Sequence, residues 1–119
     1  MKDGYGTISR GRAVKCVNAY GKPAWYFVRV AIKYNELTDA VVWEGQLFSG
    51  KVGNEAKLIG FPISLGERSE LLGQVFNESM RLTKSLALWT SAKELLEDAE
   101  AEALKRGLLG DEGADDYDY

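Results

Sequence analysis

The first half of the chain alternates apolar and polar residues in the pattern of β-strands. Residues 7–18 are rich in β-branched side chains, and a turn sequence at residues 20–23 follows them directly. Residues 24–34 have aromatic and β-branched residues throughout, and residues 40–48 resume the same pattern. A fourth strand is predicted over residues 57–64, so the first half indicates an antiparallel sheet that begins with a hairpin.

From about Arg68 the spacing of apolar residues changes to three and four, which predicts helix as far as Trp89. The sequence Ser91-Ala-Lys-Glu94 matches a capping box, so the region forms either one long helix or two shorter ones. A further apolar stripe ends at Gly107, a residue type that commonly terminates helices, and it consists of Leu95, Leu96, Ala99, Ala103 and Leu104.

These patterns predict one domain and a tail. We expect residues 1–107 to form an α+β domain, a four-stranded antiparallel sheet followed by one or two C-terminal helices, because 119 residues suffice for one core. A five-stranded OB-fold barrel is the alternative, although few strands follow Asn54. Residues 108–119 hold five acidic residues and no basic ones, and we expect a disordered acidic tail.

The composition excludes most catalytic chemistry. Histidine is absent, which removes the usual general base and the usual zinc ligand. The single cysteine, Cys16, lies in an apolar pattern that suits a small buried side chain. We therefore expect no enzymatic activity, no metal and no cofactor. No apolar run is long enough to span a membrane and no signal peptide is recognisable, so we expect a cytoplasmic protein, in the host cytoplasm if it is viral.

The strongest predicted strand has two different faces. Residues 5–34 contain six basic residues and no acidic one, which favours an anionic partner. The alternation of side chains along the strand assigns one face to the core, namely Tyr26, Val28, Val30 and Ile32. The other face combines large rings with cations, namely Trp25, Phe27, Arg29 and Lys33.

Rings that stack on bases, next to cations that neutralise phosphates, are typical of surfaces that bind single-stranded nucleic acid. The candidate binding residues are Lys15, Tyr20, Lys22, Trp25, Phe27, Arg29 and Lys33. The alternative is that the C-terminal helix covers Trp25 and Phe27 and that the cations only surround them. In the tail, rings alternate with carboxylates, which predicts a protein-docking segment at Asp115, Asp116, Tyr117, Asp118 and Tyr119. A plain solubilising tail is the alternative there.

A basic hairpin among the strands, followed by Gly60-Phe-Pro-Ile-Ser-Leu65 and Leu71-Leu-Gly-Gln-Val-Phe76, resembles the Whirly-type domains, which include the transcriptional positive-cofactor family. The acidic, aromatic end of the chain resembles the tails of bacterial and phage single-stranded DNA-binding proteins, although it ends in Tyr where those end in Phe. The helical region is also longer than Whirly-type domains need. Together these resemblances imply a sheet-and-helix fold that binds single-stranded DNA.

We therefore expect a protein that binds single-stranded DNA with little sequence specificity and supports replication or recombination. RNA is also possible as a ligand, since the sequence does not distinguish the two. The tail would contact other replication or recombination proteins. The apolar surface at Leu82, Leu86 and Trp89 would pair two copies into a homodimer. The alternative function is a protein-binding adaptor, or a phage inhibitor of a host factor, that binds no nucleic acid.

Overall fold

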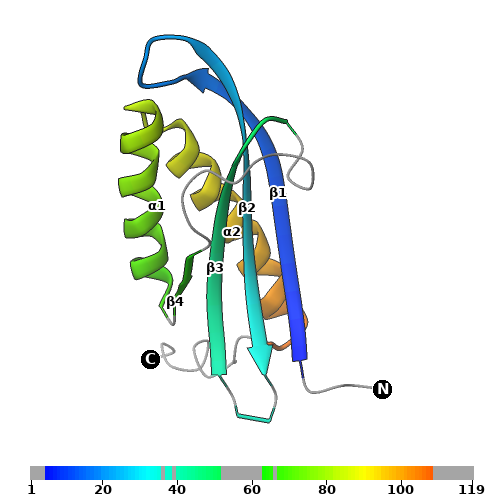
Figure 1. Cartoon of the computed structure of the whole chain (residues 1–119). Coiled ribbons are helices and arrows are strands. Elements are labelled where there is room, and N and C mark those ends of the chain that lie inside the picture. The colour runs from blue at the N-terminus through cyan, green and yellow to red at the C-terminus, as the bar shows by residue number, and fades with distance from the viewer. Residues whose placement is uncertain (1–4, 36, 39, 52–62, 66, 109–119) are drawn as a thin grey trace, which may run out of the picture.

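The computed structural model describes residues 5–35, 37–38, 40–51, 63–65 and 67–108, and its elements are shown in Figure 1. Three long strands form an open antiparallel sheet: β1 (Tyr5–Val17), β2 (Pro23–Asn35) and β3 (Ala40–Ser49). A three-residue strand, β4 (Ile63–Leu65), pairs with β3, and the strand order is β1-β2-β3-β4. Two helices follow, α1 (Arg68–Thr83) and α2 (Ala87–Lys105).

The α+β class predicted from the sequence is confirmed, with an open sheet in place of a closed barrel. The three long strands lie within two residues of their predicted bounds. Most of the fourth strand predicted over residues 57–64 falls outside the described residues, and the three-residue β4 overlaps it only at residues 63 and 64.

The helices cover one face of the sheet only. In Figure 1, α2 runs diagonally behind β1 and β2, and α1 lies beside it on the side of β3 and β4. The core between the two layers contains the predicted inner face of β2 together with apolar residues of the helices, among them Leu71, Leu88 and Leu96, which are fully buried. On α2 the predicted stripe is buried at Leu95, Leu96, Ala99 and Ala103, whereas Leu104 is 56% exposed. The small alanines let α2 lie close to the sheet.

Ion pairs fix the helical layer to the sheet. Arg10 and Arg12 on β1 bind Asp98 and Glu94 on α2, at 3.0 Å and 2.7 Å. The carboxylate of Glu100 accepts hydrogen bonds from Arg68 Nε at 2.7 Å and from Trp43 Nε1 at 3.3 Å. Glu100 therefore joins β3, α1 and α2.

Of the two predicted arrangements, one long helix or two shorter ones, the structure has two helices. The break lies at residues 84–86, so the predicted continuation of the first helix through Trp89 is wrong. Lys84 adopts a left-handed conformation with a φ of 54°. Thr83 Oγ1 donates to the Ser79 carbonyl at 2.8 Å, and Ser79 Oγ donates to the Ser85 carbonyl at 2.9 Å. Short hydroxyl side chains compete in this way with helical hydrogen bonds and stabilise a turn.

No helix restarts at Ser91, so the match of Ser91 to Glu94 with a capping box is accidental. Ser91 is buried in the second turn of α2, well after the helix has begun. The beginning of α2 is instead helped by Ser85 Oγ, which accepts a hydrogen bond from the Ala87 amide at 3.1 Å.

The end of α2 agrees with the predicted stop. Gly107 has a φ of 75°, its amide donates to the Leu104 carbonyl, and the Leu108 amide donates to the Ala103 carbonyl at 2.8 Å. This pair of hydrogen bonds is a Schellman motif, in which glycine adopts the left-handed conformation at little cost. Leu108, which the sequence pattern assigned to the tail, packs against the core. The rest of the tail lies outside the described residues.

Candidate functional site

The sheet face opposite the helices carries the predicted ring-and-cation residues. Because antiparallel partners lie on the same face, the strand register places Lys15 of β1 beside Trp25, and Phe48 of β3 beside Phe27. Trp25 is 36% exposed, and Phe27 and Arg29 are half-buried. The predicted alternative, in which the C-terminal helix covers Trp25 and Phe27, is wrong, because both described helices pack on the other face.

A cluster of two rings and one guanidinium forms the middle of this face. The Phe27 and Phe48 rings meet edge to face, with centroids 6.4 Å apart. The Arg29 guanidinium carbon lies 5.7 Å from the Phe27 centroid and 5.5 Å from the Phe48 centroid. At these distances both rings attract the cation through their quadrupoles. The cation and the rings therefore occupy one continuous patch.

A close approach between strands fixes the position of the Phe27 ring. A Cβ atom added at Gly11 on β1 would lie 2.5 Å from Cζ of Phe27. The ring consequently lies over the glycine of the neighbouring strand, where a larger residue would have to displace it. This contact gives a physical reason for a glycine inside a strand.

The Trp25 ring has a cation of its own. Lys51 Nζ lies 4.7 Å from the centroid of the Trp25 ring. The preceding residue, Gly50, has a φ of 104° and donates its amide to the Trp25 carbonyl at 2.8 Å. This turn after β3 brings the lysine back over the tryptophan.

Phe48 and Lys51 were not among the residues predicted from the sequence. Phe48 could have been found, since the alternation that assigns Leu47 to the core places its neighbour on the opposite face. Lys51 could not, because its position depends on the turn at Gly50 and on how β3 pairs with β2.

The basic residues of the first two strands do not all contribute to this face. Arg10 and Arg12 point to the helical side, where carboxylates of α2 bind them. Lys33 lies on the predicted face but pairs with Glu44 at 3.2 Å, and it is eight residues, or about 26 Å, along β2 from Trp25. Among the described residues, Lys15, Lys22 and Arg29 have no carboxylate partner. The unpaired cations therefore gather toward the hairpin end of the sheet.

Tyr20 and Lys22 lie in the turn of that hairpin. Tyr20 is 88% exposed. Asn18 Oδ1 accepts hydrogen bonds from the amides of Tyr20, at 2.8 Å, and Lys22, at 3.0 Å. The Ala19 amide donates to the Leu82 carbonyl at the end of α1, which ties the turn to the helical layer. Both predicted residues thus lie in a turn at one end of the sheet, next to the end of α1.

The single cysteine, Cys16, is partly buried in β1. Burial raises the pKa of the Cys16 thiol, which disfavours the reactive thiolate. Among these residues, no group of three or more His, Cys, Asp or Glu is placed to hold a metal ion. No described helix is both long enough and apolar enough to cross a membrane. The predicted docking residues Asp115 to Tyr119 lie outside the described part of the chain.

Comparison with known proteins returned no significant match: no family model, no curated protein and no solved structure is similar to the chain. The resemblance to Whirly-type domains stays a prediction.

Proposed function

We propose that the protein binds single-stranded DNA on the open face of its sheet. The supporting observation is that three rings, Trp25, Phe27 and Phe48, lie among cations on the sheet face that no described helix covers. Stacking of a base on such a ring is worth about 1–3 kcal/mol and depends little on the base. In this proposal the protein binds the faces of unpaired bases and the phosphate backbone, and it has little sequence preference. Proteins that coat single strands in replication or recombination need this property.

The geometry favours a single strand over a duplex. Trp25 and Phe27 are two residues apart on one strand, a separation of about 7 Å, and their faces are available only to bases that are not already paired and stacked. Base pairs in a duplex hide their faces from protein side chains, whereas unstacked bases expose them.

The charges set the expected dependence on salt. Lys15, Arg29 and Lys51 surround the rings, and three phosphate contacts on a single strand give a slope of log affinity against log salt of about −2. Lys33 adds less, because binding phosphate would require it to leave Glu44.

Arg29 and Arg12 provide a matched pair of variants for the test. They lie on adjacent strands, nearly opposite in register, but face different sides of the sheet. Labelled oligo-dT, oligo-U and a duplex would be titrated by fluorescence anisotropy at several salt concentrations. Arg29→Ala should weaken oligo-dT binding at low salt and reduce the slope by about 0.7, whereas Arg12→Ala should leave the slope unchanged.

Both variants should unfold close to the wild-type midpoint, because each loses only a surface interaction. Equal effects of the two substitutions would contradict the proposed face. Absence of oligonucleotide binding at low salt would overturn the proposed function and favour the protein-binding adaptor. The comparison of oligo-dT with oligo-U decides between DNA and RNA.

A further inference from the structure

The outward side of α1 carries apolar residues that no described part of the chain covers. Phe76 is 41% exposed and Met80 is 37% exposed, and Leu86, just after the helix, is 47% exposed. Of the residues predicted to pair two copies, Leu82 and Trp89 are half-buried and pack against the core, so they offer less free surface than expected. The exposed apolar surface is therefore centred on α1.

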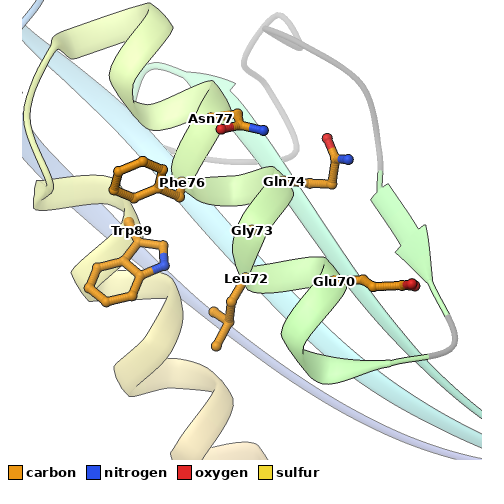
Figure 2. Close-up of a pocket in the computed structure, with 7 residues that line it drawn as sticks. All are labelled: Glu70, Leu72, Gly73, Gln74, Phe76, Asn77 and Trp89. Carbon is orange, nitrogen blue, oxygen red and sulfur yellow. The ribbon is translucent and has the colours of Figure 1, made fainter.

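A groove of about 750 Å³ adjoins this surface at Phe76. Figure 2 shows Leu72, Phe76 and Trp89 on one side of it and Glu70, Gln74 and Asn77 on the other, with Gly73 between them. The Phe76 and Trp89 rings meet edge to face, with centroids 6.2 Å apart.

Gly73 has no role in the packing of the chain itself. A Cβ atom added there would meet nothing within 4 Å, and its φ is not positive. Glycine inside a helix destabilises it relative to alanine. The missing side chain does, however, open the floor of the groove to another side chain.

The outward stripe of α1 is self-complementary when the helix is reversed. Glu70, Gly73, Asn77 and Met80 follow one another at spacings of three and four, which places them on one side of the helix. Lys84 is the C-cap residue, four positions after Met80, where the backbone is left-handed. In an antiparallel pair of α1 helices that cross between Phe76 and Asn77, Met80 of one copy meets Gly73 of the other. Glu70 of one copy then meets Lys84 of the other, and neither has an ionic partner among the described residues.

We propose that α1 binds a second copy of this chain, with Met80 of each copy seated in the groove over Gly73 of the other. A two-fold axis relates the two helices, so the contact of Met80 with Gly73 occurs twice in the dimer. Such repetition is expected when both copies use the same surface. A second copy is favoured as the occupant because the same surface carries the groove, the Met80 side chain that would fill it, and the opposite charges of Glu70 and Lys84. The sheet face lies on the opposite side of the molecule and stays free in this dimer.

Sedimentation of the full chain without nucleic acid tests the proposal. The mass should rise from 13.2 kDa toward twice that value with increasing concentration. Gly73→Gln fills the groove without a clash inside the chain, so it should abolish association without lowering the thermal midpoint. A monomer at every concentration, or a Gly73→Gln variant that associates like the wild type, would overturn the pairing.

A charge reversal tests the orientation. Glu70→Lys alone places two like-charged pairs in the dimer and should weaken association by about tenfold or more. Adding Lys84→Glu should restore most of it, because the pairs are then opposite in sign again. Failure of the double variant to recover would exclude the antiparallel arrangement, whatever the outcome of the nucleic-acid titrations.

Discussion

Lys51 should compete with a base for the Trp25 ring, and this competition has a signature in the salt dependence of binding. In the free protein the ammonium lies 4.7 Å from the ring centroid. A base that stacks on this face of the ring must displace it, and the released ammonium can then contact a phosphate. Lys51→Ala removes the competition for the ring, which raises affinity, and the phosphate contact, whose loss lowers affinity.

The sizes of these two effects predict that the plots of log affinity against log salt concentration for Lys51→Ala and for the wild type cross. An exposed cation–π contact is worth about 0.5–1 kcal/mol, so near 1 M salt, where phosphate contacts contribute little, the variant should bind about two- to fivefold more tightly. Loss of one phosphate contact reduces the slope by about 0.7, so at 0.05 M salt the variant should bind about 1.5- to 3.5-fold more weakly. The two lines should therefore intersect between about 0.1 and 0.3 M salt.

Fluorescence anisotropy of labelled oligo-dT from low to high salt measures both lines. Lys15→Ala is the matched control, because Lys15 is the register partner of Trp25 and makes no described contact with a ring. Its line should approach the wild-type line at high salt without crossing it. A Lys51→Ala line that stays below the wild type at every salt concentration would refute the competition. If the wild type binds no oligonucleotide, the proposed function itself fails.

Two further predictions concern two glycines of the helical layer and the acidic end of the chain. Gly107→Ala should lower the free energy of unfolding by about 1 kcal/mol, because alanine resists the left-handed φ of 75°. Gly73→Ala within α1 should raise the free energy of unfolding by about the same amount, because alanine favours a helix interior over glycine. Thermal unfolding measures both changes, and a stabilised Gly107→Ala variant would contradict the Schellman motif. Removal of residues 109–119 eliminates five carboxylates and changes the formal charge from −3 to +2, so affinity for oligo-dT should rise at low salt and converge with that of the full chain at high salt. Lower affinity after truncation would mean that the tail is part of the binding surface.

The sequence alone determined the local structure of most of the domain. Alternation of side chains specified the three long strands and separated Trp25 and Phe27 from Val28 and Val30, because successive side chains on a strand point to opposite faces. Gly107 marked the end of α2, because few other residues adopt a positive φ without cost.

Which face the helices would cover was decided only by the tertiary structure. The outer face of β2 also carries two large rings, Trp25 and Phe27, so the sequence left open whether a helix would cover them. The helices cover the Val28 face. There the buried alanines of α2 allow close packing, and carboxylates of α2 form ion pairs with Arg10 and Arg12. The break at Lys84 also depended on hydroxyl groups from three positions meeting in one turn.

The composition of the open face was likewise decided by pairing between strands. Phe48 joins Phe27 and Arg29 because β3 pairs with β2 in one particular register. Lys51 reaches Trp25 because the Gly50 amide binds the Trp25 carbonyl. Such contacts join residues about 20 or more positions apart, and the periodicity of a single strand contains no information about the register of its neighbour.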